Sequence, residues 1–242
     1  MTGVELAVVA AVVGLAAAAQ MVSGFGFALL AVPLMGLVID VKTAVVVCTI
    51  CGTASNTYQA IVDRADRDTG LAIRLITASI LGMPLGWLLL EHATSDQLKV
   101  IVGVMVLVAV VLVSRASNRA VQWRPLDWVA GVVSGALAIA TSTNGPPLVV
   151  LLRAKKLSPQ VFRSTINSVF CVVALVSIAV FALGGRITGN VGKAAMFAIP
   201  GLVIGIWFGR VVRGRLSERV FWRLVLATLI GTAVASIATG LA

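Results

Sequence analysis

Residues 4–39 read VELAVVAAVVGLAAAAQMVSGFGFALLAVPLMGLVI, an apolar run that is interrupted once. The interruption, Ser23-Gly24-Phe25-Gly26, separates the apolar blocks 4–22 and 26–39. The first block has about the 20 residues that a helix needs to cross a hydrocarbon core about 30 Å thick. A break directly after such a block predicts a pair of helical segments in the membrane instead of one simple crossing.

The apolar composition extends over the whole chain. Of its 242 residues, 60% are hydrophobic and only 12% are charged, whereas an ordinary soluble domain has about 25% charged residues. No water-soluble fold of this size could bury so much apolar surface. The sequence therefore predicts an all-α integral membrane protein with the lipid bilayer as its surroundings. The expected segments are 4–22, 26–39, 43–62, 70–90, 98–114, 126–143, 145–152, 161–183, 193–212 and 219–240.

The formal net charge of +10 raises the question of a nucleic-acid partner. The basic residues, however, lie in short loops between apolar blocks, which is typical of membrane topology signals and not of a nucleic-acid-binding surface. We therefore expect no nucleic-acid partner. A cleaved signal peptide at 4–22 is also disfavoured, because this segment carries Glu5 where a basic region would be needed.

Two sequence features predict an internal duplication. Ser23-Gly24-Phe25-Gly26 aligns with Ser142-Thr143-Asn144-Gly145, and Gly82-x-x-x-Gly86 aligns with Gly201-x-x-x-Gly205, both at an offset of 119 residues. Independent features that share one offset favour two repeats of about five helical segments each. We place the first repeat at 1–119, with a basic linker from residue 115, and the second at 120–242. The glycine pairs suit close helix packing.

The distribution of basic residues predicts how the repeats are oriented. If the opening segments of each repeat form a pair whose two ends lie on one face, thirteen Lys and Arg residues gather on one side and four on the other. Single crossings would remove this bias, which normally marks the cytoplasmic side. The paired arrangement predicts repeats of inverted topology in the cell inner membrane, with the linker 115–125 in the cytoplasm and both termini in the periplasm.

The two breaks are the candidate substrate site. An unpaired backbone group costs several kcal/mol in hydrocarbon, and the segment 145–152 is too short to cross alone, so it reads as a half-helix. Asn144 suits an N-cap and the following prolines suit the first helical turn. Helix N-termini bind anions through free N–H groups and partial positive charge, and inverted repeats bind substrate where they meet. The residues expected to frame an anion site are Gly24, Phe25, Gly26, Asn144, Gly145 and Pro146.

A tight turn at the membrane surface is the alternative, because glycine and proline suit it equally well. Polar residues near segment centres, among them Gln20, Tyr58 and Thr165, also have two interpretations. They either line a transport pathway or form hydrogen bonds between helices. Asn56 and Gln59 stand three residues apart and share a helix face. We expect a lining role for Asn56, Gln59, Asn167 and Ser168.

Catalytic groups, metal ligands and cofactor motifs are not predicted. No acidic residue stands at a segment centre, His92 is the only histidine, and Cys48, Cys51 and Cys171 lie inside apolar segments. Proton coupling through an intramembrane carboxylate is therefore not evident. The basic run Arg153, Lys155 and Lys156 either attracts an anion to the cytoplasmic mouth or serves as a topology signal.

The two breaks also carry a family resemblance. Gly24-Phe25-Gly26 is followed by Ala-Val-Pro-Leu, and Asn144-Gly145-Pro146-Pro147 is followed by an apolar run. The whole chain resembles the TauE/SafE sulfite exporter family, also called the 4-toluene sulfonate uptake permeases. The resemblance implies a transporter or exporter for a small anion such as sulfite or another sulfur-containing organic anion.

Other functions stay open on the sequence alone. An uncoupled anion channel or facilitator fits the lack of intramembrane acids, and a membrane subunit with a structural role and no cargo fits the composition. An intramembrane enzyme is disfavoured for want of a nucleophile and base. The oligomeric state is also open, with a homodimer among the possibilities.

Overall fold

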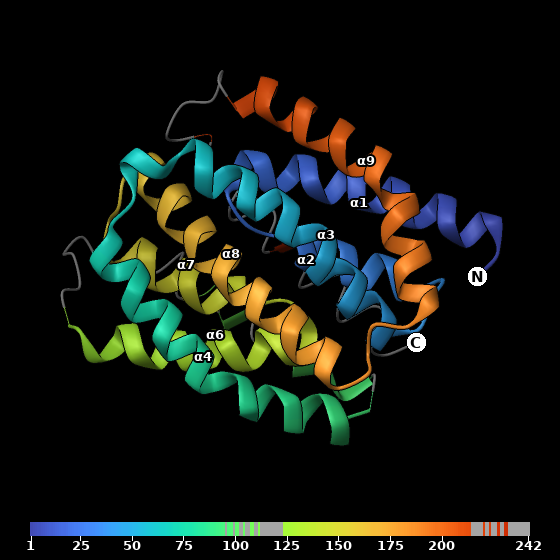
Figure 1. Ribbon diagram of the computed structural model, residues 1–242. Coiled ribbons are helices and arrows are strands. Elements are labelled where there is room, and N and C mark those ends of the chain that lie inside the picture. Colours follow the sequence, from blue (N-terminus) through green and yellow to red (C-terminus); the bar gives the residue numbers. More distant parts are fainter. Residues whose placement is uncertain are drawn as a thin grey trace.

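A computed structural model describes residues 1–94 and 123–213, together with scattered positions between 96 and 111 and between 220 and 231 (Figure 1). Every regular element in these residues is helical, as predicted. The expected segments 98–114 and 219–240 and most of the basic linker lie outside the two continuous ranges. The helices are α1 (Gly3–Ser23), α2 (Phe27–Met35), α3 (Val41–Val62), η1 (Arg64–Asp66), α4 (Thr69–His92), α6 (Pro125–Thr141), α7 (Gly145–Ala154), α8 (Pro159–Leu183) and α9 (Gly189–Arg213).

Acidic side chains begin two of the long helices. Asp40 accepts a hydrogen bond from the backbone amide of Thr43 at the start of α3, and Asp68 accepts one from Leu71 at the start of α4, both at 2.9 Å. These bonds satisfy amide groups that a helix leaves unpaired in its first turn. Both helices therefore begin one or two residues before the apolar blocks that predicted them.

The helices fall into two length classes. Helices α1, α3, α4, α8 and α9 are 21 to 25 residues long and apolar enough to cross a membrane. Helices α2 and α7 have 9 and 10 residues and, at 1.5 Å per residue, extend only about half the hydrocarbon thickness. The short helix expected at 145–152 is confirmed. The helix expected at 26–39 ends earlier, at Met35, because the chain turns at Gly36 and stays in turns to residue 39.

Glycines let α4 and α6 pack closely. A Cβ atom at Gly82 would overlap the backbone carbonyl of Val132, and one at Gly86 would overlap that of Ala136. The contacts advance together along the two helices, so α4 and α6 run in the same direction. The Gly82-x-x-x-Gly86 pair therefore lies in a helix interface, as predicted.

Helices α1 and α9 form the corresponding pair. A Cβ atom at Gly201 would overlap the backbone of Ala10, and one at Gly205 would overlap that of Gly14. These contacts also advance together, so α1 and α9 are parallel. Both glycine pairs predicted from the sequence thus bring the backbones of two neighbouring helices into direct contact.

One end of the bundle is rich in basic residues, and we call it the basic end. Asp63, after α3, pairs with Arg213 at the end of α9 at 2.8 Å. Asp127, in the first turn of α6, pairs with Lys155 at 2.8 Å and with Arg74 at 3.0 Å. The described basic residues at this end are Arg64, Arg67, Arg74, Arg124, Arg153, Lys155, Lys156, Arg163, Arg210 and Arg213.

The opposite end carries fewer basic residues. Arg186, between α8 and α9, pairs with Glu91 at the end of α4 at 2.6 Å, and Lys42 lies within electrostatic reach of the same carboxylate. The N-terminus lies at this opposite end, on the right in Figure 1. The bundle therefore has the asymmetric charge that the loop sequences predicted.

The ion pair between Asp127 and Lys155 allows a test of the packing at the basic end. Its side chain is fully buried, and the side chain of Lys155 is only 9% exposed. We expect Asp127→Ala to destabilise the protein by about 3–5 kcal/mol, because it leaves a buried ammonium group without its counter-ion. Thermal unfolding in detergent measures the loss. Glu91→Ala is the matched control, since it removes a partly exposed surface pair and should shift the unfolding temperature far less. Equal shifts would contradict the burial of Asp127.

The middle of the bundle is formed by α3 and α8, which contact each other. Helix α2 packs against α3, and α7 packs against both α6 and α8. The two short helices, and the breaks that precede them, therefore lie beside the central pair instead of at the surface of the bundle.

Candidate functional site

The first break requires two left-handed glycines. Gly24, directly after α1, has φ of 84°, and Gly26, directly before α2, has φ of 93°. Only glycine adopts this backbone region without a steric cost. The hydroxyl of Ser23 donates a hydrogen bond to the carbonyl of Phe25 at 2.6 Å, which satisfies a backbone group between the two helices.

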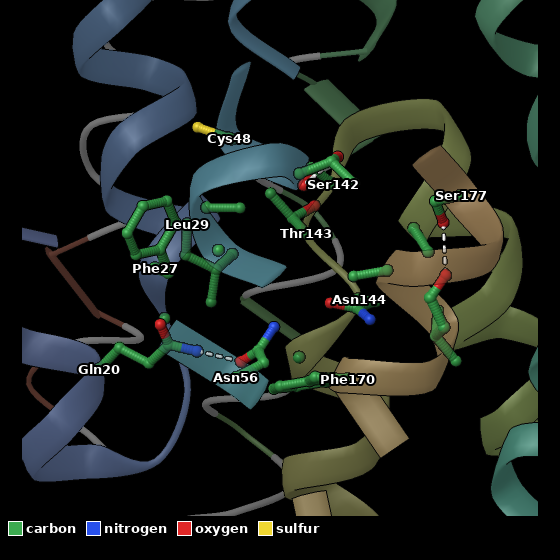
Figure 2. A pocket seen from close by; sticks show the side chains of 18 residues that line it. Gln20, Phe27, Leu29, Cys48, Asn56, Ser142, Thr143, Asn144, Phe170 and Ser177 are labelled. Atoms are coloured by element: carbon green, nitrogen blue, oxygen red, sulfur yellow. Dashed lines mark hydrogen bonds between the residues drawn. The ribbon is translucent and has the colours of Figure 1, made fainter. Parts of the chain in front are cut away.

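The second break is held against α3. Ser142, directly after α6, has φ of 57°, and its hydroxyl lies 3.0 Å from the hydroxyl of Thr49. Asn144 stands at the N-cap position of α7, as expected, but its side chain makes no capping hydrogen bond. The backbone carbonyl of Asn144 accepts a hydrogen bond from the Ser134 hydroxyl at 2.9 Å. The side-chain amide of Asn144 faces the space between the helices (Figure 2).

The two breaks meet at one cavity. Phe25 lies so close to Gly145 that a Cβ atom there would be 3.3 Å from the ring, and residues from both breaks line a cavity of about 40 Å³. A water molecule needs about 10–15 Å³ of such space, so the cavity holds a few waters or one small oxyanion. The polar side chains that line it are Gln20, Cys48, Thr49, Asn56, Ser142, Thr143, Asn144 and Ser177.

A pair of carboxamides forms one wall. Gln20 Nε2 donates a hydrogen bond to Asn56 Oδ1, and the Asn56 amino group turns towards the cavity (Figure 2). Gln20 is 1% exposed, and its Oε1 has no hydrogen-bond partner among the described residues. Leaving a buried polar atom unpaired costs about 1–3 kcal/mol. This wall therefore offers polar groups to whatever enters the cavity.

Helix N-termini supply the electrostatics. The first hydrogen bond within α2 runs from the Leu30 amide to the Gly26 carbonyl, so the amides of Phe27, Ala28 and Leu29 have no acceptor inside the helix. Helix α7 has fewer free amides than α2, because its second and third residues are prolines. Since the described lining residues are all uncharged, the partial positive charges of the helix ends dominate the cavity.

Four of the residues expected from the sequence line this cavity: Gly26, Asn56, Asn144 and Gly145. Three other residues of the breaks lie just outside it. Gly24 packs against Arg163, Phe25 packs edge-on against Phe162 with ring centroids 6.4 Å apart, and Pro146 is buried in the first turn of α7.

The remaining three expected residues lie nearer the basic end. Gln59 is fully buried and donates a hydrogen bond to Asn167 at 3.2 Å. Ser168 accepts a hydrogen bond from Arg67 at 3.5 Å. These side chains hold α3, α8 and the loop before α4 together, and they do not line the central cavity.

Several lining residues were not assigned to the site from the sequence. Thr49 and Ser177 each donate a hydrogen bond to a carbonyl four residues earlier in their own helix, as such residues do in any apolar helix. Nothing in the sequence therefore separates them from structural residues. Gln20 gave a clearer signal, because it is a large polar residue after the run Ala16–Ala19.

Comparison with known proteins identifies the family. The family model described as "Sulfite exporter TauE/SafE" matches residues 9–236, a span that contains both breaks and every residue that lines the cavity. Searches of curated proteins and of solved structures gave no match. The members of this family are transporters and not enzymes. The chain therefore belongs to the sulfite exporter TauE/SafE family of membrane transporters.

Proposed function

We propose that this transporter carries a small sulfur oxyanion, of the size of sulfite, through the cavity between the two breaks. The proposal is based on the observation that helices α2 and α7 both begin at the same uncharged cavity. Free amides and helix dipoles bind an oxyanion without a basic side chain. Because no permanent positive charge holds the anion there, it can also leave, as transport requires.

The side-chain amide of Asn56 adds a hydrogen-bond donor for an oxyanion. Its carbonyl is used by Gln20, so its amino group is the part that a ligand meets. Hydrogen bonds from an amide to a charged oxygen are stronger than those to a neutral one. Asn144, on the other side of the cavity, offers a second amide.

Cavity size favours a small ion. A volume of about 40 Å³ admits a sulfite-sized anion but not the aromatic ring of an aryl sulfonate. We expect proteoliposomes that contain the purified protein to take up labelled sulfite, and toluene sulfonate to compete weakly. Flux equal to that of protein-free liposomes would contradict the proposed function. Strong competition by toluene sulfonate would contradict the size limit.

We further propose that the chain consists of two inverted-topology repeats, 1–119 and 120–242. Shifting the bounds of α2 and α3 by 119 residues gives 146–154 and 160–181, close to the bounds of α7 and α8. Helix α6 runs parallel to α4 from the basic end, whereas α1 runs parallel to α9 from the opposite end. This opposite direction of α1 and α6 supports the inversion.

The basic end is proposed to face the cytoplasm, because basic loops are retained there. We expect Ala65→Cys, in η1, to react with a membrane-impermeant maleimide only from the cytoplasmic side. The matched variant is Asn190→Cys, in the first turn of α9, which should react only from the periplasm; both residues are exposed. Labelling is measured after the three native cysteines have been replaced by serine. The reverse pattern would contradict the proposed topology.

A facilitator without a coupling ion is the second candidate. Among the described residues no acid lines the cavity, and the buried Asp127 is neutralised by Arg74 and Lys155. Uptake that persists when proton and sodium gradients are collapsed would favour this candidate. Uptake that stops would favour coupled transport.

A further inference from the structure

A second cavity lies between α1, α3 and α9 at the basic end. Its volume is about 160 Å³, several times the space that a single water needs. Its lining includes Met21, Tyr58, Gln59, Asp63, Arg210 and Arg213. Unlike the central cavity, it contains guanidinium groups.

Positive charge exceeds negative charge around this second cavity. Arg213 pairs with Asp63 at 2.8 Å, and Arg210 donates a hydrogen bond to the Tyr58 hydroxyl at 2.6 Å. A further arginine, Arg163, lies within electrostatic reach of both Arg213 and Asp63. Arg163 also lies within electrostatic reach of Asp66. Two carboxylates thus stand among three guanidinium groups, and the remaining positive charge favours the arrival of another anion.

The two cavities lie one helical turn apart. Gln20 and Asn56 line the central cavity, whereas their neighbours Met21 on α1 and Gln59 on α3 line the second. A spacing of three residues advances about 4.5 Å along a helix. An anion that leaves one cavity therefore has only one layer of side chains to pass.

That layer is polar and incompletely paired. Gln20 donates to Asn56, and Gln59 donates to Asn167. In both pairs the glutamine Oε1 is buried without a hydrogen-bond partner among the residues described. Buried polar atoms in native proteins are normally paired with protein or water. Both atoms are acceptors, so they can bind water or the hydroxyl group of a protonated oxyanion. The layer between the cavities is therefore polar and not a sealed apolar barrier.

We propose that the second cavity is a second oxyanion site in series with the central one. Arg213 exchanges the Asp63 carboxylate for the anion, while Arg210 provides a second guanidinium. The proposal rests on the proposed function, because it takes the same oxyanion to be the ligand. It adds a separate binding step at the basic end, with Asp63 as the competing carboxylate.

Equilibrium binding of labelled sulfite to the purified protein in nanodiscs of neutral lipid tests the proposal. We expect two anions to bind per wild-type chain, and one to bind to Arg213→Gln. Asp63→Asn should tighten the weaker site by about tenfold, since it removes the competitor of the anion. Arg64→Gln, an exposed arginine on η1 at the same end, is the matched control and should bind two anions.

The outcomes separate the two proposals. One bound anion in the wild type, unchanged in Arg213→Gln, would overturn the second site and leave the proposed function standing. No bound anion, together with no flux, would overturn both. If Arg213→Gln does not fold, the effect of Asp63→Asn decides, and unchanged binding in that variant would overturn the second site. If the Arg213-dependent site binds anionic lipid but binds no sulfite in neutral lipid, the site recognises a lipid headgroup and the proposal is overturned.

Discussion

Gly135→Leu is expected to prevent the protein from folding. A Cβ atom at this position in α6 would overlap the backbone carbonyl of Ser79 in α4. Overpacking against flexible side chains costs about 1–3 kcal/mol, but here the obstacle is the backbone of a packed helix. A loss above about 4–5 kcal/mol follows, which is comparable to the whole stability of a marginally stable protein. The fraction of monodisperse protein after detergent extraction measures the effect.

Gly192→Leu is the control for this prediction. Gly192 lies in α9, and no atom comes within 4 Å of the position that its Cβ atom would occupy. The variant should be extracted in amounts close to the wild type. Normal yield and normal thermal stability of Gly135→Leu would show that α4 and α6 do not pack as closely as described.

Asn144→Leu is expected to lose most sulfite transport while it still folds. The side chains are similar in size, and Asn144 makes no capping hydrogen bond that the substitution would break. The change removes an amide from the cavity wall and replaces it with an alkyl group. Losing a hydrogen bond to a charged ligand lowers affinity by about tenfold to a hundredfold. Initial flux at low sulfite concentration in proteoliposomes measures the loss.

Asn190→Leu supplies the comparison, because Asn190 is an exposed asparagine in the first turn of α9. It should transport as the wild type does. Gly26→Val should abolish flux, since its left-handed backbone is strained with any side chain and the added atoms enter the cavity lining. Wild-type flux in Asn144→Leu would remove this residue from the site.

The helices could be predicted from the sequence because the bilayer imposes their length. Apolar blocks placed the bounds of α1, α3 and α8 within about two residues, and the glycine breaks identified where the short helices begin. The early end of α2 could not be foreseen, because the residues after Gly36 are as apolar as those before it.

The site was predicted only in part, because its residues come together through tertiary packing. The contact of Phe25 with Gly145 joins residues that are far apart in the sequence. Gln59 and Asn167 have the same polar, mid-helix pattern as Asn56, yet they bond to each other instead of lining the central cavity. A sequence pattern does not distinguish these two uses of an amide.

Lys155 illustrates the same difficulty for charges. The sequence allowed it either to attract an anion or to act as a topology signal. The structure pairs its ammonium group with the buried Asp127 at 2.8 Å, so its charge is neutralised within the fold. The basic groups that line the second cavity are instead Arg210 and Arg213, at the end of α9.

The most direct measurement is to locate a bound anion. Selenite is a pyramidal oxyanion like sulfite, and selenium gives an anomalous diffraction signal. Crystals of the protein grown with selenite should show a selenium peak beside the amides of Phe27–Leu29 and the side chains of Asn56 and Asn144. A protein that transports selenite but shows no peak between the two breaks would contradict this site.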